Sequence, residues 1–161
     1  MHGDSPLKYF SEPVKTELYS KVARVGGDKD GRIDFDRPAR LAGNWFTSDL
    51  QPVSSTENFG NGSKHLAFVR DVNDPSLIRI SIGGSLSISG AFYVQAGAAD
   101  PAEISSASGK TVYQLSFFPT QQPAGVMFVQ MMADDRIQVE TFPPGTPAAA
   151  AFTGAALTYV R

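Results

Sequence analysis

From Gly31 onward the chain alternates apolar and polar residues with a period of two, and this pattern constrains its fold more than any other feature. Runs of apolar or β-branched residues recur at 32–36, 40–48, 64–71, 77–84, 90–97, 110–118, 125–133, 136–142 and 151–161. Such alternation is typical of strands that are buried on one face only. Turn-forming sequences separate several runs, as in NDPS, ADDR and PPGTP at 73–76, 133–136 and 143–147. The pattern predicts an all-β domain.

The short spacings between runs favour antiparallel neighbours, because parallel strands need long crossover connections. After the first short run, about eight strands remain, which is the number that closes a small up-and-down barrel. We therefore expect an antiparallel meander barrel, with a β-sandwich as the alternative fold. The alanine-rich run at 151–161 is the weakest of the expected strands, since alanine favours helix.

One helix is expected before the barrel, over residues 12–25. Ser11 is a suitable N-cap, Pro13 suits the first turn, and Gly26 and Gly27 would end the helix. Its apolar stripe consists of Val14, Leu18, Val22 and Val25. An isolated helix of this length is marginal in water, so we expect the stripe to pack on one end or face of the barrel. The whole chain, 1–161, is predicted to be a single domain with a helical lead over 1–27 and the barrel over 31–161.

Composition excludes several classes of function. The 161 residues include no cysteine, which excludes thiol catalysis, thiolate metal sites and disulfides. The net charge is −2 and no basic run is present, which argues against nucleic acid as a partner. No apolar run reaches the length of a membrane span, and the start lacks the pattern of a signal peptide. We expect either a protein of the bacterial cytoplasm or a domain of a longer exported protein.

The run Gly43-Asn44-Trp45 contains the only tryptophan, and Arg161 ends the last expected strand. Together these features resemble the calycin superfamily of β-barrels, which includes the lipocalins. The resemblance implies that Trp45 lies at the closed end of the barrel with the guanidinium of Arg161 across its ring, a contact worth about 1 kcal/mol. The long helical lead and the missing disulfide depart from lipocalins. The sequences at 31–46, 66–71, 80–84 and 129–140 also resemble uncharacterised domains of larger bacterial exported proteins, a resemblance that implies no mechanism.

Motifs for metal or acid–base chemistry are incomplete. The run 26–36 resembles a calcium-binding EF-hand loop, but the decisive first and twelfth ligand positions fall on Gly26 and Arg37. We therefore expect this run to bind calcium weakly or not at all. His65 is the only plausible catalytic imidazole, and without identifiable partners it is interpreted as a structural residue of a strand. No catalytic residue, metal or cofactor is predicted.

The apolar run 125–133 is hydrophobic on both faces, which suits either an adaptable ligand cavity or a core. The candidate ligand-binding residues are Trp45, Tyr113, Phe128, Gln130, Tyr159 and Arg161. We expect a non-enzymatic binding or accessory module for a small apolar ligand or for other domains of a longer parent protein. The alternatives are a cyclase-type barrel enzyme, which acts by orienting its substrate, and a purely structural domain with a filled core. An open apolar cavity inside the barrel would favour the binding module. Tyr or Arg side chains that converge on one point inside it would favour an enzyme, and a filled interior would favour the structural domain.

Overall fold

The computed structural model describes residues 5–26, 29–31, 35–49 and 62–161. Near the N-terminus lie the 3-10 helix η1 (Pro6–Tyr9) and the helix α1 (Val14–Ser20), and two further short 3-10 helices are η3 (Gly62–Lys64) and η4 (Ser106–Ser108). The strands of the described chain are β1 (Gly43–Thr47), β2 (His65–Arg70), β3 (Ile78–Ile82), β4 (Gly90–Val94), β5 (Lys110–Ser116), β6 (Pro123–Ala133), β7 (Arg136–Phe142) and β8 (Leu157–Val160).

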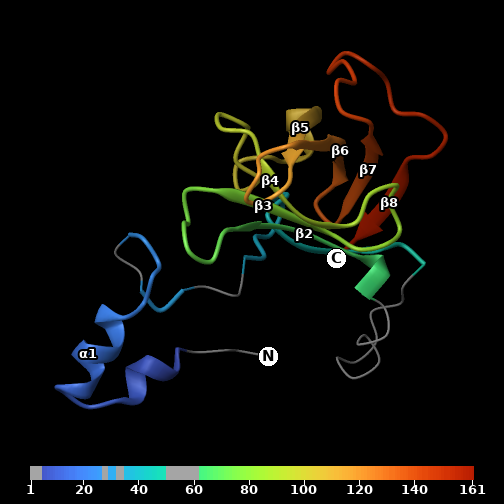
Figure 1. Cartoon of the computed structure of the whole chain (residues 1–161). Coiled ribbons are helices and arrows are strands. Elements are labelled where there is room, and N and C mark those ends of the chain that lie inside the picture. The colour runs from blue at the N-terminus through green and yellow to red at the C-terminus, as the bar shows by residue number, and fades with distance from the viewer. Residues whose placement is uncertain (1–4, 27–28, 32–34, 50–61) are drawn as a thin grey trace.

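These eight strands form a closed barrel in chain order, as Figure 1 shows. Each strand is antiparallel to the next, and β8 returns to pair with β1 through Phe46–Val160 and Thr47–Tyr159. The predicted antiparallel meander barrel is therefore confirmed, and the alternative β-sandwich is not observed. In the last expected run only 157–160 is a strand, while 143–156 form a loop rich in alanine, proline and glycine, residues with little preference for strands.

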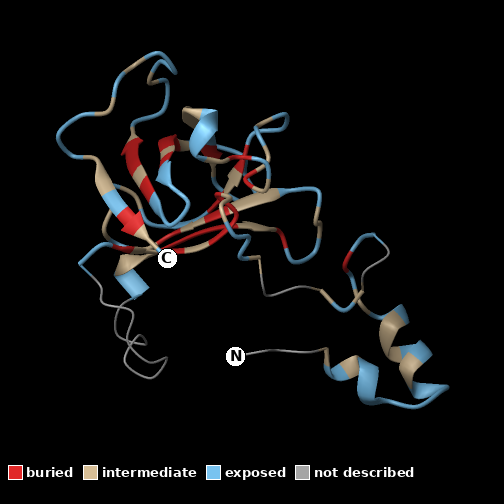
Figure 2. Cartoon of the chain, turned by 180° about the vertical axis from the view of Figure 1, so that it is seen from behind, coloured by how far each residue is buried: buried red, intermediate tan, exposed pale blue. Residues whose placement is uncertain are grey.

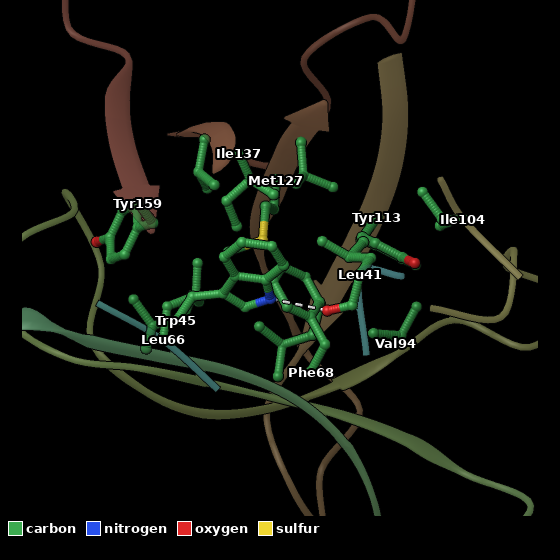
Figure 3. Packing of buried hydrophobic residues seen from close by; sticks show 14 of the residues in the cluster. Leu41, Trp45, Leu66, Phe68, Val94, Ile104, Tyr113, Met127, Ile137 and Tyr159 are labelled. Atoms are coloured by element: carbon green, nitrogen blue, oxygen red, sulfur yellow. Dashed lines mark hydrogen bonds between the residues drawn. The ribbon is translucent and has the colours of Figure 1, made fainter. Parts of the chain in front are cut away.

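Alternate side chains of every strand pack into one hydrophobic core. Figure 3 shows part of it, in which Trp45 lies among Leu66, Phe68, Met127 and Tyr159. Figure 2 shows the buried residues concentrated along the strands of the barrel. The buried cluster comprises Leu41, Trp45, Leu66, Phe68, Ile80, Ile82, Phe92, Val94, Ile104, Tyr113, Leu115, Met127, Val129, Met131, Ile137, Val139 and Tyr159. Close packing of this kind leaves the barrel filled rather than hollow.

Both ends of the barrel are covered by connecting segments. At the end where β1 begins, the amide of Leu41 donates to the carbonyl of Ile104 at 3.0 Å, and both side chains join the core. At the other end, Leu86 and Ile88 of the β3–β4 loop pack against the core. The hydroxyl of Ser87 lies 2.8 Å from that of Thr141, which ties this loop to β7.

The N-terminal helix is present but shorter than expected, and the barrel does not cover it. None of the residues of α1 is buried, and Val14 is 45% exposed. The helix ends at Ser20, with Lys21 as its C-cap, so Val22 and Val25 lie beyond it and the predicted apolar stripe is split. Figure 1 shows α1 apart from the barrel. The expected packing of the helix on the sheet is therefore wrong.

Candidate functional site

Trp45 and Arg161 form the contact that the sequence predicts. Trp45 is fully buried, and its indole N–H donates to the carbonyl of Leu41 at 2.8 Å (Figure 3). The guanidinium carbon of Arg161 lies 3.7 Å from the centre of the indole ring. Both predictions, the burial and the contact, are confirmed.

Gly43 is required by the close approach of Asp36. Its φ is +118°, and a Cβ atom at this position would lie 2.1 Å from the carboxylate Oδ1 of Asp36. That oxygen accepts hydrogen bonds from the main-chain amide of Asn44 at 2.6 Å and from its side-chain amide at 3.1 Å. Each residue of the run Gly43-Asn44-Trp45 thus has its own structural role. Gly43 allows the close approach of Asp36, Asn44 forms hydrogen bonds with Asp36, and Trp45 packs in the core.

The six candidate ligand-binding residues do not lie together. Trp45, Tyr113 and Tyr159 point into the core. Arg161 covers Trp45 at the end of the barrel where β1 begins, which we call the closed end. Phe128 and Gln130 lie instead on the outer face of β6. The outward Phe128 is buried beneath the β7–β8 loop, with its ring centre 4.5 Å from that of Phe142 and 6.0 Å from that of Phe152. The structure therefore places three of the candidates in the core, Arg161 at the end of the barrel, and two on the outer face.

The polar groups inside the barrel do not converge on one point. The phenol of Tyr113 donates to the carbonyl of Ala99 at 3.0 Å, and the guanidinium of Arg161 donates to main-chain carbonyls. Burial raises the pKa of Tyr113, and it raises the pKa of Tyr159 to about 12. Both phenols are thus uncharged at neutral pH, as filled-core residues should be.

Two hollows of the described chain border this core, and their linings include the core residues Phe68 in one and Val94 and Leu115 in the other. The smaller, of about 120 Å³, adjoins the ion pair of Arg70 with Asp100 at the closed end. It is well below the size of small-molecule pockets, which span roughly 300–1,000 Å³. The larger has about 560 Å³ and falls within that range. We call it the β4–β5 cleft; its lining comprises Leu77, Tyr93, Val94, Gln95, Ala96, Gln114, Leu115, Ser116, Phe118, Pro119, Gln121 and Pro123.

The β4–β5 cleft forms where the pairing of two strands is short. β4 and β5 pair only through Tyr93–Ser116 and Val94–Leu115. Beyond Ser116 the chain turns, and in that turn the amide of Gln121 donates to the carbonyl of Phe117 at 2.8 Å. The turn leaves Phe118 on the outside, 65% exposed. The cleft therefore combines a sheet floor with an aromatic rim.

The floor of the cleft is held by a buried carboxylate. The phenol of Tyr93 donates to Oδ2 of Asp71 at 2.8 Å, and Arg79 donates to the same oxygen at 3.0 Å. The main-chain amides of Asn73 and Asp74 donate to Oδ1 at 2.8 and 3.0 Å. Burial alone would raise the pKa of Asp71, but these hydrogen bonds outweigh it and lower the pKa to about 2.

The aromatic ring of Tyr93 also contacts Arg79 and Phe118. The guanidinium carbon of Arg79 lies 4.8 Å from the ring centre, and the ring of Phe118 lies 5.1 Å from it at a tilt of 48°. Tyr93 thus links the buried Asp71 to the exposed Phe118. These contacts hold the aromatic floor of the cleft in place, a feature that sequence reasoning missed. The adjacent Phe117-Phe118-Pro119, which interrupts the alternation at a strand end, was the signal available.

The polar side chains of the cleft are three carboxamides and the hydroxyls of Tyr93 and Ser116, and both hydroxyls donate within the protein, to Asp71 and to the carbonyl of Tyr93. Gln95, Gln114 and Gln121 line it and are exposed, and their side-chain amides have no hydrogen-bond partner within the described part of the chain. The lining holds no lysine, arginine, histidine, aspartate or glutamate among the described residues. The cleft is therefore neutral but able to form hydrogen bonds.

His65 lies on the outer face of β2 with structural partners. Its Nε2 is 2.9 Å from the side-chain oxygen of Asn44, and its ring lies 5.4 Å from that of Phe46. Burial lowers the pKa of His65. Within the described ranges no three histidine, aspartate or glutamate side chains gather as a metal site. Part of the run 26–36 lies outside the described residues, so the expectation about calcium stays a prediction.

Comparison of the chain with family models, with curated proteins and with solved structures finds no match. The resemblance to calycins thus stays a hypothesis based on Trp45, Arg161 and the strand order. Among the described helices none is long and apolar enough to cross a membrane.

Proposed function

We propose that the chain is a non-enzymatic binding module with a calycin-like barrel, in which the filled barrel is a scaffold and the β4–β5 cleft binds the ligand. The observation that carries the proposal is the cleft itself, about 560 Å³ in volume, with Tyr93 fixed at its floor and Phe118 exposed at its rim. Sites whose residues are held in place before binding lose less entropy when the ligand arrives. The ligand therefore binds on the outside of the barrel, in contrast to the interior site suggested by the sequence.

A purely structural domain is the second candidate, and the filled interior favours it. The interior holds large side chains such as Trp45, Phe68 and Tyr159, all fully buried. A scaffold of this kind could serve a longer protein without binding any ligand. The two candidates differ in what they expect of the cleft, since only the binding module uses it.

The uncharged fluorescent probe N-phenyl-1-naphthylamine, which brightens in apolar sites, distinguishes them. We expect saturable binding by the full chain and clear weakening in Phe118→Ala, because this substitution removes the exposed ring of the cleft. Met132→Ala is the matched control, since Met132 is 55% exposed and lies outside the lining. Circular dichroism would verify that both variants keep the fold. Absent binding, or equal binding by both variants, would overturn the proposal in favour of the structural domain.

A further inference from the structure

Resting on the proposed function, we propose that the ligand of the β4–β5 cleft is a neutral oligosaccharide. One sugar ring packs against Phe118, and its hydroxyls form hydrogen bonds with the carboxamides of Gln95, Gln114 and Gln121. The inference combines three properties of the lining: its charge, its hydrogen-bonding groups and its exposed apolar surface.

The charge of the lining selects a neutral ligand. Asp71 and Arg79, the charged side chains that contact Tyr93, form an ion pair with each other. They hold Tyr93 at the floor of the cleft and are not among its lining residues. An ionic ligand entering the cleft would lose hydration without gaining an opposite charge, which is unfavourable.

The hydrogen-bonding groups of the lining match hydroxyls. A carboxamide both donates and accepts, and a hydroxyl does the same, so each can satisfy the other in either direction. Gln95 directly follows β4 and Gln114 lies on the neighbouring β5, and the main-chain amide of Gln95 donates to the carbonyl of Gln114 at 3.1 Å. Gln121 comes from the turn that carries Phe118. The amides therefore border the cleft on both its sheet and its turn side.

The exposed apolar surface matches the C–H face of a sugar ring. Phe118 is 65% exposed and Leu77 is 40% exposed, although both are large hydrophobic residues. Covering such surface removes apolar area from water and stabilises the complex. A ligand with one apolar face and hydroxyls at its edge meets both parts of the lining at once.

A peptide is disfavoured because the main chain at the cleft is already paired. Tyr93 and Val94 pair with Ser116 and Leu115, so neither strand offers a free edge there for strand addition. A proline-rich peptide, which needs aromatic surface and few main-chain bonds, is the remaining competitor.

Titration of the 15N-labelled full chain with cellohexaose, maltohexaose, laminarihexaose and a decaproline peptide tests the inference. We expect at least one of the hexasaccharides to shift the side-chain amide signals of the three glutamines. Phe118→Ala should weaken that binding about tenfold and Gln114→Ala by several-fold. Met132→Ala, outside the cleft, should leave it unchanged.

The outcomes separate this inference from the proposed function. If no hexasaccharide shifts the glutamine signals at millimolar concentration while the fluorescent probe still binds at Phe118, the assignment of an oligosaccharide ligand is overturned. The proposal that the cleft is a binding site is then retained. Binding of decaproline in place of the sugars would likewise overturn the sugar and assign a peptide. Loss of probe binding and of every titration effect would refute the proposed function as well.

Discussion

The guanidinium of Arg161 lies across the indole ring of Trp45 and also donates to the segment that closes the barrel. Its Nη1 donates to the carbonyl of Arg37 at 2.9 Å, and its Nη2 donates to those of Arg40 at 2.9 Å and Ala42 at 3.2 Å. One side chain after β8 therefore fixes both the first strand and the chain that leads into it. Arg161 therefore holds β1, β8 and the segment before β1 together at the closed end.

Replacing Arg161 should destabilise the closed end of the barrel. We expect Arg161→Ala to lower the free energy of unfolding by about 1–2 kcal/mol, because a cation–π contact and charged hydrogen bonds are lost at a partly solvated site. Arg161→Lys should recover less than half, since an ammonium cannot reproduce the planar fork. Urea unfolding measures the change. Arg136→Ala, an exposed arginine at the start of β7, is the control, and an equal loss there would contradict the assignment.

Gly43 should tolerate no side chain. A Cβ atom would lie 2.6 Å from Cα of Asp36, which is main chain and cannot turn aside, and φ is already +118°. We expect Gly43→Ala to lower the free energy of unfolding by about 1–3 kcal/mol. Gly154→Ala is the control, because a Cβ atom there meets nothing within 4 Å. A melting temperature equal to that of the parent chain would show that Asp36 lies elsewhere in solution.

The strand order could be predicted from the sequence because alternation and short turns are local signals. The Trp45–Arg161 contact came from a resemblance, and it connects residues that no local pattern relates. The interpretation of Phe128 as a cavity residue failed to consider the outer face. There the long β7–β8 loop covers it, with Lys110 donating to the carbonyl of Ala148 at 2.9 Å. A loop that folds back on a sheet leaves no periodic signal.

The β4–β5 cleft was beyond sequence reasoning for a related reason. It depends on where the pairing of β4 with β5 stops, and register is a property of two strands together. The helix was misjudged because Val22 and Val25 continue the spacing of Val14 and Leu18, although the helix has ended before them. Spacing indicates a helical face but does not show where a helix ends.

Asp71 should make stability depend on pH in the acid range. Its pKa of about 2 in the folded state lies below the ordinary 3.8, so its contribution is complete above the ordinary value and is lost as the pH falls toward 2. The shift corresponds to about 2 kcal/mol. We expect urea unfolding free energies to fall by this amount between about pH 5 and pH 2.

Asp71→Asn separates this effect from other carboxylates. The variant should be less stable near neutral pH, since one of the two acceptor oxygens becomes an NH2 group that cannot accept its two hydrogen bonds. It should also lose most of the pH dependence in that window. Asp134→Asn, at an exposed turn, should keep the dependence of the parent chain. An unchanged slope in Asp71→Asn would contradict the role given to this carboxylate.

Glu140 should hold the β7–β8 loop on the outer face of the barrel. Its carboxylate accepts from the main-chain amide of Thr153 at 2.7 Å and from the Thr153 hydroxyl, and the residue is buried. Glu140→Ala leaves both donors unpaired, so we expect a loss of about 1–3 kcal/mol and faster proteolysis within 143–156. Cleavage sites mapped by mass spectrometry measure the second effect. Glu103→Ala, an exposed carboxylate, should leave cleavage in the loop unchanged.

Leu18 should contribute little to the stability of this chain. α1 contacts η1 and buries none of its residues, so truncating Leu18 removes no core packing. We expect Leu18→Ala to change the free energy of unfolding by less than about 0.5 kcal/mol, the range of surface substitutions. Ile80→Ala, at a fully buried position of β3, should cost about 2–5 kcal/mol. Thermal melts of the two variants compare them directly. A loss for Leu18→Ala as large as that for Ile80→Ala would mean that the helix packs on the barrel after all, as its apolar stripe first suggested.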